Sequence, residues 1–82
     1  MRLDKFLKVS RILKRRTVAK ELAVNERIYL NGKIAKAGSQ VAVDDIIEVI
    51  FGTRTLKVKV LALASHIKKD DADMLYEVLE SK

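Results

Sequence analysis

The sequence predicts an α+β domain, in which two N-terminal helices pack on a small, mostly antiparallel sheet of about four strands and a further helix follows at the C-terminus. Three observations predict this order. Apolar residues recur at helical spacing through residues 1–24, and from residue 27 onward they alternate with polar residues between turn signals. Helical spacing then returns over residues 68–80. With 82 residues and no proline or linker, the chain is expected to fold as a single domain over 1–82.

The first helix is expected over residues 3–13. One side of its helical wheel carries Leu3, Phe6, Leu7, Ser10 and Leu13. The opposite side carries Lys5, Lys8 and Arg11. The segment is therefore expected to be an amphipathic helix with a basic outer face.

A second, shorter helix is expected after the sequence KRRT at residues 14–17, with Thr17 as its N-cap and its end near Val24. Its apolar stripe consists of Val18, Ala19, Leu22 and Ala23. Because two of these side chains are alanines, the helix can approach a neighbouring element closely.

Two hairpins are expected after the helices. The first turns at Asn31-Gly32, a dipeptide that strongly favours a tight hairpin turn. The second pairs strands at 45–51 and 54–64. In the last of these strands, one face changes from lysine to leucine, which predicts that another element covers its far end.

The expected cover is a C-terminal helix over 68–80. Residues at helical spacing in this segment are Ala72, Leu75, Tyr76 and Leu79. Acidic residues near the positive end of this helix are Asp70, Asp71 and Asp73.

The net charge is confined to the first part of the chain. Lys and Arg number 17 and Asp and Glu 11, giving +6, and residues 1–24 hold eight of the bases and two of the acids. The rest of the chain is neutral. A basic pole of this kind indicates a polyanionic partner, either nucleic acid or an anionic membrane surface.

Nucleic acid is the better fit for this pole. Arg11, Arg15 and Arg16 supply planar donors suited to bidentate phosphate contacts. The second helix begins beside them, so its free backbone N–H groups reinforce an anion site. Tyr29 alone is an expected exposed aromatic in the first hairpin, which argues against a base-stacking platform and favours recognition of duplex RNA by shape and charge. Lys14, at the apolar edge of the first helix, either contacts RNA or reaches solvent.

Other functional classes find little support. The chain has no cysteine, which excludes disulfides and thiolate metal sites and suits the cytosol. His66 is the single histidine, and Asp44-Asp45 fits a turn better than a metal pair. No nucleophile–base pair or phosphate-binding glycine loop is visible, so we expect no enzyme, no cofactor and no metal.

Membrane association is also not expected. Charged residues interrupt the N-terminal segment, which excludes a signal peptide, and no window approaches the roughly 18 apolar residues of a membrane span. A membrane-surface role for the first helix remains an alternative, since bases opposite Leu and Phe also suit lipid headgroups. Its apolar side, however, is needed to cover the sheet.

Four motifs resemble those of a known family: RLDKFL at 2–7, RRTVAKEL at 15–22, RIYLNGK at 27–33 and VAVDDIIEV at 41–49. Together they resemble the RNA-binding domain named after small-subunit ribosomal protein four, the S-four domain, whose fold is the alpha-L motif. Over nearly its full length, the chain is similar to the stand-alone RqcP family of bacterial ribosome-associated quality control. The ribosome-recycling heat-shock protein has the same domain.

The resemblance implies that Arg2, Arg16 and Lys20 face structured RNA, and that Asp4 orients nearby basic side chains. Combined with the charge pattern, it predicts these RNA-binding residues: Arg2, Lys5, Lys8, Arg11, Arg15, Arg16, Thr17 and Lys20.

The resemblance also implies a function. Such proteins bind the large ribosomal subunit with a stalled peptidyl-tRNA and contact both ribosomal RNA and tRNA. They stabilise that tRNA while an alanine-tailing quality-control factor on the same subunit directs C-terminal alanine addition. The chain is thus expected to be a cytoplasmic, ribosome-associated monomer that binds no membrane. The alternatives are a general ribosomal RNA binder in recycling or assembly, and a membrane-surface or protein-adaptor module.

Two positions depart from the family pattern. Glu26 stands where glycine is usual, so Asn25 is expected to take the left-handed conformation in its place. Asp44-Asp45 replaces a common Gly-Asp turn. Both departures concern local turn geometry only.

Overall fold

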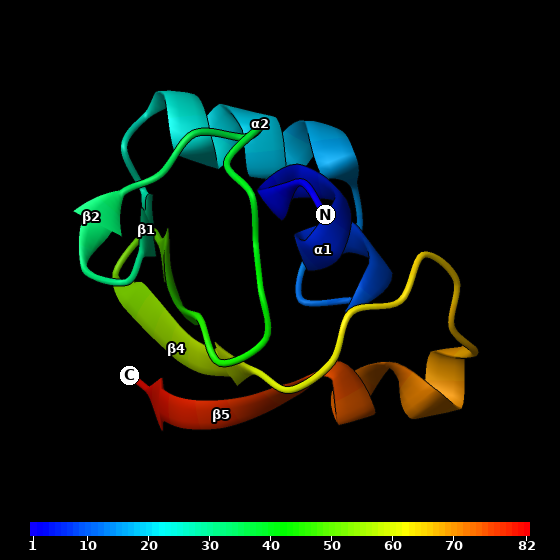
Figure 1. Ribbon diagram of the computed structural model, residues 1–82. Coiled ribbons are helices and arrows are strands. Elements are labelled where there is room, and N and C mark those ends of the chain that lie inside the picture. Colours follow the sequence, from blue (N-terminus) through cyan, green and yellow to red (C-terminus); the bar gives the residue numbers. More distant parts are fainter.

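The computed structural model describes residues 1–82, and Figure 1 shows its arrangement. The helices are α1 (Leu3–Val9), α2 (Arg16–Val24) and a short 3-10 helix, η1 (Lys69–Leu75). The strands are β1 (Ile28–Leu30), β2 (Lys33–Ile34), β3 (Ile46–Phe51), β4 (Arg54–Val60) and β5 (Tyr76–Ser81). The predicted α+β class is confirmed, with five strands where about four were expected.

All neighbouring strands pair antiparallel, in the order β2-β1-β3-β4-β5. The helices α1 and α2 pack together beside this sheet (Figure 1). Side chains of β4 alternate along the strand: Val58 and Val60 are fully buried, whereas Lys57 and Lys59 are only partly covered. The strand therefore has one face in the core and one toward solvent.

The core lies between the two helices and the sheet. Its fully buried apolar side chains are Leu3, Phe6 and Leu7 of α1, Ala19 of α2, and Ile28, Ile47, Val49, Val58 and Val60 of the sheet. Burying a side chain of the size of leucine or phenylalanine contributes about 1.5–3 kcal/mol. The small Ala19 and Ala23 lie on the buried side of α2, as predicted, whereas Val18 of the same predicted stripe is 37% exposed.

The first helix is shorter than the predicted 3–13. It ends at Val9, with Ser10 as its C-cap, because Arg11 adopts a left-handed backbone conformation (φ 62°). The Arg11 N–H donates to the Lys8 carbonyl at 3.1 Å, which satisfies one carbonyl of the last turn. This turn still returns Leu13 to the core, where it is 5% exposed.

The predicted caps of the second helix are wrong at both ends. Arg15 is the residue before the first turn and forms no side-chain cap, so Thr17 already lies inside the helix. At the other end, Glu26 takes the left-handed conformation (φ 60°), whereas Asn25 stays at φ −87°. The Glu26 and Arg27 N–H groups donate to the carbonyls of Ala23 and Leu22, which is a Schellman motif.

The two hairpin turns lie where they were expected. Asn31 and Gly32 both have positive φ and join β1 to β2, and Gly52 has positive φ in the turn between β3 and β4. In the loop before β3, Asp44 has a φ of 76°, so it takes the role that glycine has in the usual Gly-Asp turn.

The C-terminal segment differs from the helix predicted over 68–80. Residues 69–75 are helical, but Tyr76–Ser81 form β5 at the edge of the sheet. The register explains the difference, because it places Glu77 opposite Lys59 and Glu80 opposite Lys57. The segment thus completes the hydrogen bonding of β4 along its edge, where a covering helix would have left that edge unpaired.

The strand before this segment is also shorter than predicted. β4 ends at Val60, where 54–64 was expected. The Leu61 and Ala62 N–H groups both donate to the Leu75 carbonyl, at 2.8 and 3.3 Å, so the regular pairing with the C-terminal segment ends here. Leu61 and Leu63 remain partly exposed, so the predicted cover over them does not form.

The N-terminus is held against the loop between β2 and β3. The Leu3 N–H donates to the Ser39 carbonyl at 2.8 Å, and the Asp4 N–H to the Ala37 carbonyl at 3.0 Å. These bonds satisfy the first N–H groups of α1, which have no partner inside the helix. The loop therefore determines where α1 begins and where the side chains of its first turn point. None of the helices has the length and apolar character needed to cross a membrane.

Candidate nucleic-acid interface

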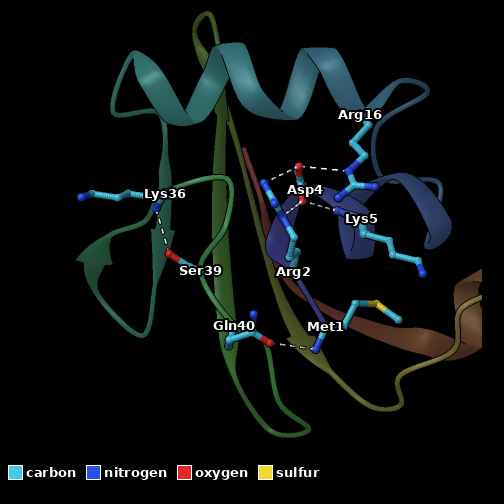
Figure 2. Close-up of polar contacts among 8 residues, drawn as sticks. All are labelled: Met1, Arg2, Asp4, Lys5, Arg16, Lys36, Ser39 and Gln40. Carbon is cyan, nitrogen blue, oxygen red and sulfur yellow. Dashed lines mark hydrogen bonds and ion pairs between the residues drawn. The ribbon is translucent and has the colours of Figure 1, made fainter.

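A buried carboxylate lies at the centre of the basic pole. Asp4, in the first turn of α1, is 0% exposed, and two guanidinium groups converge on it (Figure 2). Arg2 donates to it through Nε and Nη2 at 3.2 and 3.3 Å. Arg16, from the start of α2, has its Nε 3.0 Å from Asp4 Oδ2. The predicted role of Asp4 in orienting basic side chains agrees with these contacts.

The contact of Arg16 differs in kind from that of Arg2. Its Nε forms an ion pair with Asp4 Oδ2, whereas Arg2 contacts the carboxylate through two hydrogen bonds. The Lys5 backbone N–H donates to Asp4 Oδ1 at 2.9 Å and adds a neutral donor beside the two guanidinium groups. A carboxylate with these neighbours can be buried while charged, since opposite charges and N–H donors replace the water that burial removes.

These neighbours also determine the protonation state of Asp4. Its burial alone would raise the pKa of the carboxyl group. The Arg16 guanidinium, the Lys5 backbone N–H and the Arg2 guanidinium outweigh burial and hold the pKa of Asp4 below its ordinary value. Asp4 is therefore ionised at neutral pH and fixes both arginines in place.

Both arginines keep donors for a ligand. The side chains of Arg2 and Arg16 are 50% and 42% exposed. A guanidinium has five N–H donors, and the contact of Arg16 with Asp4 is made through Nε, so the N–H groups on its two Nη atoms can donate to a ligand. Donors in this planar arrangement match the oxygens of a phosphate group.

The beginning of α2 adds a second source of positive potential. No side chain caps the helix and its first turn holds no acid. The free N–H groups of that turn therefore lie next to Arg16, as predicted for an anion site. We name Arg2, Asp4, Arg16 and the first turn of α2 the arginine corner.

The predicted RNA-binding residues lie in three regions: the arginine corner, the exposed side of α2 and the far end of α1. Lys5 is half-buried, and its side chain extends away from Asp4 in Figure 2. Exposed residues on or just before α2 are Arg15, Thr17 and Lys20. Lys20 lies one turn after Arg16, so the two side chains share a face of the helix. Lys8 and Arg11, also exposed, lie toward the other end of α1 from Asp4.

Sequence reasoning missed the residues that support Arg2. A Cβ atom on Gly38 would lie 3.7 Å from Arg2 Cζ, so the guanidinium group packs against the backbone at this glycine. Gln40 Oε1 accepts a hydrogen bond from the N-terminal amine at 3.2 Å (Figure 2). Both residues come from a loop that is distant in sequence, so no local pattern signals their place beside the N-terminal segment.

Comparison with known proteins places the chain in a family. The family model described as the S4 domain, which is the S-four domain, matches residues 1–47. The RQC P-site tRNA stabilizing factor of Streptococcus pneumoniae is 53% identical over 96% of this chain and 90% of that protein. The Bacillus subtilis protein of the same name is 49% identical over 100% of this chain and 95% of its own. The chain therefore belongs to the S4 domain family, and within it to the group that these two relatives represent.

The fold agrees with a solved structure. A trimeric Vibrio cholerae heat shock protein 15 superposes with a TM-score of 0.87 at 24% identity, over 95% of this chain and 80% of that one. At this identity the likeness shows the fold alone. The α1, α2 and sheet arrangement is therefore shared, while the arginine corner rests on the contacts of this chain.

Proposed function

We propose that this protein binds the large ribosomal subunit that carries a stalled peptidyl-tRNA, and that it stabilises the tRNA in the P site during C-terminal alanine tailing. In this proposal it contacts both ribosomal RNA and tRNA. An alanine-tailing quality-control factor acts on the same subunit, and the present chain acts as a monomer in the cytoplasm.

The observation that carries the proposal is the arginine corner on a chain of this family. Two half-exposed arginines are held by one buried carboxylate, so their guanidinium groups are positioned before RNA arrives. Less side-chain freedom is then lost on binding, which increases the affinity. Two relatives that are named as P-site tRNA stabilizing factors support tRNA as one RNA that this surface contacts.

In this mechanism the protein binds and does not catalyse. The arginine corner and the exposed bases of α2 contact the sugar-phosphate backbone, so recognition depends on the shape and charge of folded RNA. Formation of the peptide bond is left to the ribosome. The contribution of this chain is to slow the departure of tRNA from its site.

Binding to large subunits loaded with P-site tRNA tests the proposal. We expect Arg16→Ala and Arg2→Ala each to weaken binding by about 10- to 100-fold, the effect of losing a charged hydrogen-bonded contact. Arg54→Ala is the matched control, because Arg54 is exposed, lies at the β3–β4 turn and belongs to neither α1 nor α2. Wild-type affinity in both corner variants would contradict the site assignment.

A general role in recycling or assembly of ribosomal subunits is the alternative within the same class. A heat shock protein 15 homolog of Haemophilus influenzae, 29% identical over 99% of this chain, is the relative that favours it. Crosslinking in cells followed by RNA sequencing separates the two roles. Large-subunit RNA recovered together with tRNA supports tRNA stabilisation, whereas recovery of assembly precursors supports the alternative.

A further inference from the structure

A second basic site lies at the other end of α1. The segment that joins β4 to η1 runs beside this end of the helix (Figure 1), and a groove of about 460 Å³ separates them. Polar residues that line it are Lys8, Arg11, Lys14, Ser65, His66 and Lys69. The last three lie outside the part of the chain that matches the S4 domain, so the C-terminal segment contributes half of this polar lining.

The cations of this groove have no acidic partners. None of Lys8, Arg11, Lys14 and Lys69 takes part in an ion pair, and no carboxylate lines the groove. Two lysines outside the groove do have acidic partners: Lys59 lies 3.7 Å from Asp44, and Lys82 lies 2.7 Å from Glu80. Four like charges around one groove repel one another in the free protein, and a bound anion would remove that repulsion.

Arg11 supplies an independent observation. Its backbone is left-handed at the residue after the C-cap of α1, a position that glycine occupies without strain. A side chain with a Cβ is disfavoured there. The local fold would thus be more stable with glycine, whereas arginine places a guanidinium group at the groove.

We propose that this groove binds a phosphodiester group of the RNA backbone as a second contact, separate from the arginine corner. The inference rests on the proposed function, since it requires that the chain binds RNA. Arg11 supplies the bidentate donor and the lysines supply charge. The Ser65 hydroxyl and one N–H of the His66 ring are additional hydrogen-bond donors.

RNA is the occupant that the geometry favours. Asp4 lies in the first turn of α1 and Lys8 in its last, so the rise of an α-helix places them roughly 6 Å apart along its axis, and Arg11 lies beyond that end of the helix. The groove therefore continues the surface that begins at the arginine corner, so that one RNA backbone can reach both. The protein then grips RNA at two points along α1, and rotation about a single contact is prevented.

Arg11→Gly is the decisive variant, because its effects on stability and binding are expected to be opposite. The melting temperature should rise as the backbone strain is removed. Binding to large subunits loaded with P-site tRNA should weaken about 10-fold or more, as for a charged contact. The magnitude of the log-log salt slope should fall by about 0.7–0.9, the amount expected when one phosphate is no longer neutralised. Lys69→Ala and His66→Ala should weaken binding without a change in melting temperature.

Two controls match this variant. Glu26→Gly relieves the same backbone conformation outside the groove, so it should raise the melting temperature and leave binding unreduced. Arg54→Ala removes one positive charge at the β3–β4 turn and should leave the affinity close to that of the wild type.

The outcomes separate this inference from the proposed function. If Arg11→Gly, Lys69→Ala and His66→Ala keep wild-type affinity and salt slope while Arg16→Ala weakens binding, the groove inference is wrong and the proposed function stands. If the wild-type chain does not bind the loaded subunits, both are wrong. If Arg11→Gly reduces binding to phosphatidylglycerol vesicles but not to subunits, the groove binds lipid headgroups and the inference is overturned.

Discussion

Arg16 Nε, at the start of α2, lies 3.0 Å from Oδ2 of Asp4, a carboxylate that α1 buries completely. The pair joins the two helices at the point where the basic pole begins. Because Arg2 reaches the same carboxylate, one acid determines the positions of two arginines. The contact therefore serves both the packing of the helices and the presentation of guanidinium groups to RNA.

Asp4→Asn should weaken both the fold and RNA binding. The amide keeps the shape of the side chain but removes the charge that holds Arg2 and Arg16, so we expect a loss of about 1–2 kcal/mol in the free energy of unfolding. The value lies at the lower end for a buried ion pair because both guanidinium groups are half exposed. Urea unfolding of the wild type and of Asp4→Asn measures this loss in the free energy of unfolding. Asp73→Asn, at an exposed acid on η1, should leave stability unchanged.

The stability of the protein should fall in acid through Asp4. Its folded-state pKa is lowered, so the carboxylate contributes stability that is fully present above the unfolded pKa, ordinarily 3.8. That contribution is lost as the pH falls through the folded value. Unfolding measured between neutral pH and strong acid should therefore show a steeper decline for the wild type than for Asp4→Asn.

The dependence on salt separates the contribution of Asp4 from that of Glu80, a second carboxyl group whose pKa is lowered. The hydrogen bond from Lys82 lowers the pKa of Glu80, but that pair lies at the surface, where the two side chains are 77% and 41% exposed. Added salt screens exposed pairs far more than buried ones. If high salt removes the whole difference between the wild type and Asp4→Asn in acid, burial of the Asp4 pair is not its origin.

Replacing Glu26 by glycine should stabilise the protein. The residue has a φ of 60° at the end of α2, where a Cβ costs roughly 1–2 kcal/mol and glycine costs none. Because glycine also loses more freedom on folding, we expect a net gain of up to about 1 kcal/mol in the free energy of unfolding. Thermal or urea unfolding measures the gain.

Glu21→Gly is the control for Glu26→Gly, because it should lower the stability that Glu26→Gly raises. It makes the same substitution inside α2, where glycine should cost about 1 kcal/mol. A loss of stability in Glu26→Gly similar to that in Glu21→Gly would mean that α2 continues through residue 26 in solution.

A charge reversal tests the register of β5. Lys59 lies opposite Glu77, so Lys59→Glu places like charges together and should cost about 0.2–1 kcal/mol, with a further small loss from its contact with Asp44. The double variant Lys59→Glu/Glu77→Lys should recover part of that loss. Combining Lys59→Glu with Glu80→Lys should recover less, because residue 80 lies opposite Lys57. Equal recovery in both double variants would argue against this register.

Local patterns in the sequence were sufficient to locate the two N-terminal helices, the hairpin turns and the basic pole. Apolar spacing located α1 and α2, because an amphipathic helix must place its core residues on one side. Asn31-Gly32 located the first hairpin, because its backbone conformation is rare for other residues. Charge counts placed the net charge on residues 1–24, and the family motifs directed attention to Arg2, Asp4 and Arg16.

The predictions that were wrong, at the ends of α1 and α2 and in the C-terminal segment, failed for a common physical reason. Arg11 and Glu26 adopt left-handed conformations that are intrinsically unfavourable, and only the packing of the next segment of the chain stabilises them. Tyr76–Ser81 forms a strand although its apolar spacing is helical, because the open edge of β4 offers hydrogen bonds and lysines opposite its glutamates. Propensity is a local quantity, and here contacts with distant residues outweigh it.

From its sequence alone, then, this chain had to be a small basic α+β domain with helices at the N-terminus, since periodicity and charge depend on neighbouring residues. The pairing of Asp4 with Arg16, the support of Arg2 by Gly38 and the groove between Arg11 and Lys69 could be known only from the folded chain. Each brings together residues that are separated along the sequence, and their distances depend on how the helices, loops and sheet pack.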